Sequence, residues 1–241
     1  MKPFIRTKRL PLAIAVALLA LSVSLLAAVV GSDTFGVDAA GTNLTAHTAD
    51  VGGGWAKVTG ATGDFLITDA ARVRLNSVAA GAVYYHAATP ASAQYDAQVT
   101  FYKATTIAGN YHGLWANLLT SAITGYQLQY EVDAGKWVIN QVTNDSYTNI
   151  GEYAQALSDA TGYVAKLEIR TASQKAYIDG VLRITATDTT HTAVGKCGLS
   201  AYASTTAPAN TPTGIHYDNF SCTDLSSAST PNRLMLLGVS E

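Results

Sequence analysis

Apolar and polar residues alternate along most of the chain between residues 33 and 225. In segment 94–102, every second residue from Tyr95 to Phe101 is apolar, and the residues between them are polar. This period of two is typical of a strand with one buried face. Segments 111–119, 126–132 and 136–142 show the same alternation. The pattern predicts an all-β protein in which two antiparallel sheets pack face to face.

The region from residue 163 to residue 224 adds turn signals to this alternation. Asp179-Gly180 separates two apolar runs, and this pair suits a tight hairpin turn whose central residues need positive φ. Residues 195–203 and 214–223 are two more short apolar segments on either side of a proline-containing loop. We expect these two segments to form a second hairpin.

Four short motifs lie in this region: Tyr177-Ile-Asp-Gly180, Thr187-Asp188, Gly195-Lys-Cys-Gly-Leu199 and Tyr217-Asp-Asn-Phe220. In this order they resemble the closing strands of concanavalin A-like (laminin-G-like) lectin/glucanase jelly rolls. Asp33-Thr-Phe35 is similar to the opening strand of that family, and residues 44–48 with Trp55 are similar to the segment after it. The resemblance covers residues 33–225 and implies a two-sheet antiparallel jelly-roll sandwich.

The resemblance does not select an activity. The family includes hydrolases, glycan binders and inert structural modules, and such domains also occur on phage structural proteins. Because one fold hosts many functions, the chemistry has to be argued from particular residues.

The first 32 residues have a different composition. Four basic residues within the first nine precede an apolar run that extends from residue 10 to residue 31. A run of about 20 such residues is long enough to cross a bilayer as a helix, and the preceding charge would place its start in the cytoplasm. A cleaved secretory signal peptide is the alternative, with the small residues 27–31 as the cleavage region.

A third interpretation packs this run against protein. An exposed apolar stripe of such length would aggregate, so copies of itself in a helical bundle or other subunits would have to cover it. The anchor residues in this interpretation include Leu10, Leu18, Leu21, Leu25 and Val30. The apolar tail 233–239 fits the same assembly, or alternatively folds back as an edge strand. We therefore divide the chain into an anchor segment 1–32, a sandwich 33–225, and a linker and tail 226–241.

Charge narrows the choice of partners. The chain has 241 residues, of which only 13% are charged, and this length suits one large β domain. Four of the 15 basic residues precede Asp33, which leaves 11 basic residues against 17 acidic ones in the rest of the chain. An acidic body lacks the basic groove that neutralises phosphates, so we predict no nucleic-acid partner.

Candidate catalytic acids are few. A glycoside hydrolase needs two carboxylates that face each other across a cleft. Glu131 and Asp133 share a strand parity, but Asp133 suits a turn and Glu131 has no second glutamate nearby. The sequence departs from the catalytic pattern of the glucanase branch. We predict that the protein is not an enzyme, and a hydrolase that uses Glu131 with a distant acid is the less favoured alternative.

Metal ligands show no organised spacing either. The five histidines are scattered along the chain. Some jelly-roll lectins bind calcium through loop carboxylates, and the loop acids here are Asp50, Asp145, Asp159 and Asp188. They do not form a recognisable ligand series. We predict no cofactor, with calcium as the open alternative.

The two cysteines, Cys197 and Cys222, lie in the two segments of the expected second hairpin. In such a hairpin they would face each other to within one register step and could form a disulfide, which suits an extracellular compartment or a virion surface. Two small buried thiols are the alternative.

Aromatic residues are the remaining candidates for ligand binding. The chain has 13 Tyr and 3 Trp, and sugars stack their apolar faces on such rings. The candidates, which we expect in or near loops, are Tyr84, Tyr85, Tyr111, Trp115, Tyr147 and Tyr153. The alternative for each is a strand residue with a half-buried ring and a solvated hydroxyl.

These observations lead to two hypotheses for function. The first is a non-enzymatic, lectin-like decoration or tail protein on a phage virion, oligomeric through its N-terminal segment and in contact with glycans or a cell surface. The second is a secreted or membrane-anchored bacterial glycan-binding protein with the same sandwich.

Overall fold

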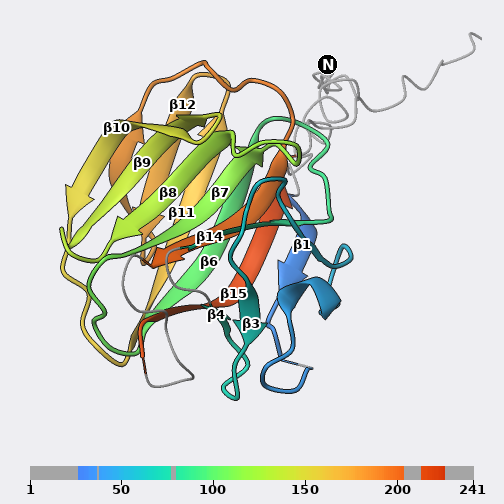
Figure 1. Ribbon diagram of the computed structural model, residues 1–241. Helices are drawn as coiled ribbons and strands as arrows, with labels where there is room; N and C mark the ends of the chain where they lie inside the picture. Colours follow the sequence, from blue (N-terminus) through green and yellow to red (C-terminus); the bar gives the residue numbers. More distant parts are fainter. Residues whose placement is uncertain (1–26, 37, 77–79, 204–212, 226–241) are drawn as a thin grey trace, which may run out of the picture. The chain divides into compact units, whose positions relative to one another are not determined.

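The computed structural model describes residues 27–36, 38–76, 80–203 and 213–225 (Figure 1). Residues Ala27–Leu225 belong to one compact unit. The anchor residues Leu10, Leu18, Leu21 and Leu25 and the tail 226–241 lie outside the described residues, so what we predicted for them stays a prediction. Within the described ranges, no helix is long and apolar enough to cross a membrane.

The described residues form two antiparallel sheets, which confirms the all-β sandwich. The first sheet has the order β13 (Val181–Ala186), β12 (Ser173–Ile178), β11 (Thr161–Arg170), β6 (Tyr95–Lys103), β15 (Ile215–Asp224), β4 (Val73–Leu75) and β3 (Phe65–Ile67), with β1 (Ala28–Asp33) also paired to β15. The second sheet has the order β10 (Ser146–Ala154), β9 (Lys136–Thr143), β8 (Gly125–Glu131), β7 (Asn110–Leu118), β14 (Lys196–Ala203), β5 (Ala80–His86) and β2 (Trp55–Lys57). One 3-10 turn, Leu44–Ala46, precedes β2.

The core lies between the sheets, and the predicted alternation creates it. In β6 every second residue from Tyr95 to Lys103 is buried, and the residues between them are half-buried on the outer face. Phe101 of this strand packs edge to face against Trp137 of β9, with ring centroids 4.9 Å apart. Apolar burial of this kind contributes roughly 25 cal/mol per Å², so the inward rows stabilise the sandwich.

The predicted hairpin turn at Asp179-Gly180 is confirmed. It joins β12 to β13, and both residues have positive φ, 52° and 77°. Glycine adopts this conformation without strain, and aspartate tolerates it better than most residues.

The predicted second hairpin is wrong. Residues of β14 pair with β7 and β5 in the second sheet, whereas β15 pairs with β6, β4 and β1 in the first sheet. The connection between β14 and β15 therefore crosses from one sheet to the other. Cys197 and Cys222 do form a disulfide, with their Cα atoms 6.2 Å apart, but this disulfide links the two sheets through the core.

A buried polar cluster explains the opening motif. Asp33, at the end of β1, is fully buried and accepts hydrogen bonds from the indole nitrogen of Trp55 (2.6 Å) and the backbone amide of Phe35 (2.8 Å). His47 lies 2.9 Å from Asp33 through Nε2, and its other ring nitrogen lies beside Asp38. Burial lowers the pKa of His47, but these two carboxylates outweigh it and raise the pKa above the ordinary value. Imidazolium therefore fits this position.

The boundary of the sandwich lies earlier than we expected. Strand β1 begins at Ala28 and pairs with β15 along its length, and Figure 1 shows the two strands side by side. Val30, which we assigned to the anchor segment, is half-buried in this strand and packs against the main core. Residues 28–32 are thus part of the sheet.

Removal of the disulfide should weaken the sandwich. The bond closes a loop with a sequence separation of 25 residues, so the chain-entropy model predicts a loss of about 3 kcal/mol of unfolding free energy in the double variant Cys197→Ala, Cys222→Ala. Urea denaturation of the oxidised protein and the variant measures this difference. An unchanged midpoint would contradict the inter-sheet link.

Stability should fall in acid because three histidines are buried in neutral form. Burial lowers the pKa of His86 and of His216 to about 4, and burial beside His216 lowers the pKa of His112 to about 3. Between these values and the ordinary value of about 6.5, only the unfolded chain binds the protons, so stability is lost as the pH falls through this window.

The variant His112→Leu should flatten this dependence. Both ring nitrogens of His112 are buried without a partner, and the substitution should decrease the proton uptake on unfolding by about one. Urea denaturation between pH 7 and pH 4 measures the slope. An identical slope in variant and parent would show that His112 is already protonated in the folded protein.

Candidate functional site

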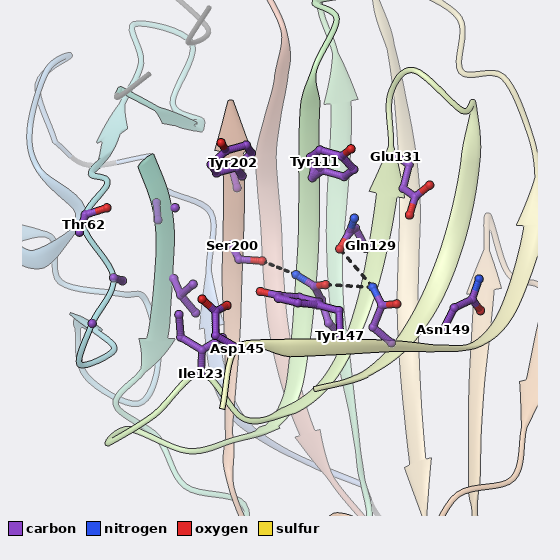
Figure 2. Close-up of a pocket in the computed structure, with 18 residues that line it drawn as sticks. Thr62, Tyr111, Ile123, Gln129, Glu131, Asp145, Tyr147, Asn149, Ser200 and Tyr202 are labelled. Atoms are coloured by element: carbon purple, nitrogen blue, oxygen red, sulfur yellow. Dashed lines mark hydrogen bonds between the residues drawn. The ribbon is translucent and has the colours of Figure 1, made fainter. Parts of the chain in front are cut away.

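A groove lies on the outer face of the second sheet, on the side away from the core. Its volume is about 580 Å³. Strands β5, β14, β7, β8, β9 and β10 contribute residues to it, and the loop residues 60–62 close one end (Figure 2). Because neighbouring residues of a strand point to opposite faces, the lining residues of β8 are Gln127, Gln129 and Glu131, whereas Tyr126, Leu128 and Tyr130 point into the core.

The floor of the groove is a hydrogen-bonded set of Gln127, Gln129, Asn140 and Ser200, which we call the amide network. Nε2 of Gln127 donates to Oγ of Ser200 at 2.7 Å. Nδ2 of Asn140 donates to Oε1 of Gln127 at 3.3 Å and to Oε1 of Gln129 at 3.1 Å (Figure 2). All four residues are buried. Buried polar groups paired in this way hold one another in fixed orientations.

Gly113 makes the amide network possible. Strand β7 lies between β8 and β14, and Gly113 pairs with Ser200 on one side and Gln129 on the other. A Cβ at this position would lie 2.6 Å from Oγ of Ser200 and still closer to the amide nitrogen of Gln127. The side chain of Gln127 therefore reaches Ser200 only because Gly113 has no side chain.

Tyr217 contacts the strands of the amide network from the core side of the sheet. This tyrosine of β15 is fully buried, and its hydroxyl accepts from the backbone amide of Gly113 at 2.9 Å. The hydroxyl donates to the carbonyl of Ser200 at 2.5 Å. Burial raises the pKa of Tyr217 well above its usual value, so the hydroxyl keeps the proton that it donates. A residue of the first sheet thus joins two strands beneath the groove.

One edge of the groove carries a pair of exposed aromatic rings. Tyr202 of β14 and Tyr111 of β7 are register partners, are 40% and 41% exposed, and have ring centroids 6.3 Å apart. Tyr111 also pairs with Glu131, so the three residues form one cross-strand row, and Figure 2 shows them side by side. Tyr147 of β10, 45% exposed, lies on the opposite side of the amide network (Figure 2).

The structure brings together two of the six predicted aromatic residues, Tyr111 and Tyr147, both of which line the groove. All six lie in strands, so none is a loop residue, although Tyr111, Tyr147 and Tyr153 lie one residue from the end of a strand and thus near loops. Tyr202 lines the groove and was not among the candidates. Its parity in β14, opposite to that of Cys197, is the signal that would have placed it on the outer face.

The other four aromatic candidates are packing residues. Tyr84 is fully buried in the core against Phe65. Trp115 is also fully buried, in an apolar cluster on the outer face of the sheet, and Tyr85 packs against that cluster. Tyr153 packs against the main core, and the guanidinium of Arg183 lies 4.8 Å from its ring centroid.

The acidic residues are spread over different environments. Glu131 lines the groove and lies 3.7 Å from the ammonium group of Lys136. Asp133 is a turn residue whose carboxylate accepts from the backbone amide of Gly109 at 2.9 Å. Asp145 also lines the groove, and Figure 2 shows it and Glu131 at opposite ends with the amide network between them. The groove thus separates its two acids.

Three of the four candidate calcium ligands have separate protein partners, and the fourth, Asp145, lines the groove. Asp50 accepts from Thr34, Asp159 pairs with Lys103, and Asp188 accepts from Tyr126. The described ranges contain no group of three or more His, Cys, Asp or Glu residues that could hold a metal ion. Calcium binding remains a prediction without a located site.

Several solved structures have an architecture similar to that of this chain. The carbohydrate binding module CBM66 from Bacillus subtilis has a TM-score of 0.57 and 18% identity over 70% of this chain and 94% of its own. LamA from Z. galactanivorans, in complex with laminaritriose and laminaritetraose, has a TM-score of 0.55 and 12% identity over 82% and 99%. A β-glucanase from Bacillus licheniformis has a TM-score of 0.51 and 14% identity over 80% and 95%.

The chain has the concanavalin A-like jelly-roll fold. The family resemblance proposed from the strand motifs is confirmed at the level of fold, and identities this low carry nothing further. No protein-family model and no curated protein matches the sequence.

A methyl group at Gly113 should break the amide network. In Gly113→Ala the new Cβ displaces Gln127 from Ser200, and loss of a buried hydrogen bond costs about 1–3 kcal/mol of unfolding free energy. Gly81→Ala is the matched control, because Gly81 lines the same groove and its Cβ would meet no atom within 4 Å. Thermal denaturation of both variants tests this, and equal melting temperatures would contradict it.

Proposed function

We propose that this chain is a non-catalytic carbohydrate-binding module that holds a glycan in the groove of its second sheet. The observation that carries the proposal is the combination of an exposed tyrosine pair with a floor of amide and hydroxyl groups in one concave site. Aromatic rings offer apolar faces to sugar C–H groups, and amides offer donors and acceptors to hydroxyls. Binding sites for small molecules commonly combine such features.

The fold comparison supports the same proposal. A carbohydrate binding module and an oligosaccharide-bound protein are among the structures with similar folds. A carbohydrate binding module and a β-glucanase are both among these structures, so the fold alone does not choose between binding and hydrolysis. The separation of Glu131 from Asp145 favours binding, because hydrolysis needs two carboxylates that flank one glycosidic bond.

Hydrolysis that uses Glu131 is the alternative. A reducing-sugar assay on the same glycans tests it, with Glu131→Gln as the inactive control. Turnover that disappears in this variant would favour the enzyme over the binding module.

Loss of the tyrosine pair should weaken glycan binding. Tyr111→Ala and Tyr202→Ala each remove a stacking surface worth roughly 1 kcal/mol, so we expect about a five- to tenfold weaker Kd by isothermal titration calorimetry. Tyr177→Ala is the control, because Tyr177 lies on β12 of the other sheet. Unchanged binding in both groove variants, or equal weakening in the control, would contradict the proposed site.

The place where the module is displayed is a separate proposal that rests on residues 1–26 and 226–241. We infer surface display, on a virion or on a bacterial cell, from the apolar composition of these segments. Mass spectrometry of the mature N-terminus distinguishes the two, because a start near residue 32 would identify a processed secretory protein. Such a start would also remove most of β1.

A further inference from the structure

Two polar atoms of the amide network have no partner within the protein. Asn140 uses both hydrogens of Nδ2, one for Gln127 and one for Gln129, which leaves its Oδ1 without a donor among the described residues. Gln129 uses its Oε1 as the acceptor, which leaves both hydrogens of Nε2 without an acceptor. Neither atom is sealed from solvent, although the two side chains are only 5% and 7% exposed. Both residues line the groove.

The hydrogen bonds within the amide network leave one donor and one acceptor available to a ligand. Two glutamine oxygens converge on the same end of the Asn140 side chain. If that amide alone were flipped, its oxygen would face two other oxygens, and the two glutamine oxygens would lose their donor. In this orientation the groove presents an acceptor from Asn140 and a donor from Gln129 on neighbouring strands β9 and β8. A flip of all three amides together would exchange the two roles and would still leave one donor and one acceptor.

We propose that Asn140 and Gln129 recognise adjacent hydroxyls of an uncharged sugar, and that the groove selects neutral glycans against acidic ones. The proposal rests on the proposed function and names the ligand class of the same site. A hydroxyl donates one hydrogen bond and accepts others, so two adjacent hydroxyls satisfy both Oδ1 and Nε2. A carboxylate or sulfate group only accepts, so it would leave Oδ1 of Asn140 facing another oxygen.

Charge in the groove supports the same ligand class. The acidic residues that line the groove are Glu131 and Asp145, and no lysine or arginine is among the described residues that line it. Recognition of anionic groups usually uses arginine or lysine. An acidic glycan would meet Asp145 at one end of this groove and Glu131, which is paired with Lys136, at the other, and no described lysine or arginine lines the groove between them.

The first test uses the unaltered protein and a panel of polysaccharides. Titration calorimetry compares neutral polymers (laminarin, dextran, inulin and galactomannan) with acidic ones (polygalacturonate, alginate and dextran sulfate) at low ionic strength, where surface charge acts most strongly. We expect at least one neutral polymer to bind, and every acidic polymer to bind at least about tenfold more weakly. An acidic polymer that binds as tightly as the best neutral one would overturn the inference.

The second test removes the free donor of Gln129 and controls for the charge that this substitution adds. Gln129→Glu keeps an oxygen that accepts from Asn140 but replaces Nε2 by another acceptor, so we expect neutral binding to weaken more than about tenfold. Asn149→Asp is the control for added charge, because Asn149 lines the groove opposite Asn140 and its side chain hydrogen-bonds to Glu152 and Gly151 instead of to Asn140 or Gln129. We expect the control to change the Kd less than about threefold.

The outcomes separate this inference from the proposed function. If the Tyr111 and Tyr202 variants lose binding while Gln129→Glu and Asn149→Asp bind alike, the site stands and the recognition pair is wrong. If no polymer of either class binds, the proposed function is wrong and the inference falls with it. The panel needs no substitution, so it decides the ligand class even if Gln129→Glu does not fold.

Discussion

The two-residue period of the strands is the constraint on which the rest of this structure depends. Strands β7, β8 and β14 each face the core on one side and the groove on the other. Leu114, Leu128 and Leu199 are register partners that form a row in the core, and the residues beside them form the groove. A slip of one residue in any of these strands would place its leucine in the groove and its polar residues in the core. Hydrophobic burial therefore sets the register of the binding face.

Hydrogen bonds between the two sheets hold the strands of the groove in position. Tyr217 reaches from β15 to the backbone of Gly113 and Ser200, and Tyr95 reaches from β6 to the backbone amide of Asn117. A side-chain hydroxyl that satisfies backbone groups of the opposite sheet is sensitive to the spacing between the sheets. The floor of the groove is thus held by residues that no ligand could touch.

The local part of this structure could be predicted from the sequence, whereas the relations between distant strands could not. Alternation identified β6 and β8, and Asp179-Gly180 identified the turn between β12 and β13, because both signals are contained in a few neighbouring residues. The expected β14–β15 hairpin was wrong because strands that follow one another usually pair, and here the chain changes sheet instead. The sequence left a disulfide and two buried thiols open as alternatives; the disulfide forms, but between the two sheets and not within a hairpin.

The candidate site shows the same division. Tyr111 and Tyr147 were among the candidates because they are aromatic, yet Tyr84 and Trp115 satisfied the same criterion and are buried. Parity separates inward from outward residues only after one strand has been assigned to a sheet and a face. The amide network depends further on the register of four strands and on the missing side chain of Gly113, and neither of these is visible within a single segment.

The pairing of β1 with β15 brings the two ends of the sandwich together. Ala28 is the register partner of Asp224, so the polypeptide enters and leaves the domain as neighbours in the first sheet, while the groove belongs to the second. A domain whose ends meet can be inserted into a host protein, or joined end to end and opened elsewhere, without rearrangement of its interior. A protein joined to both ends would be attached at this one pair of strands in the first sheet, and the second sheet would remain free to face outward.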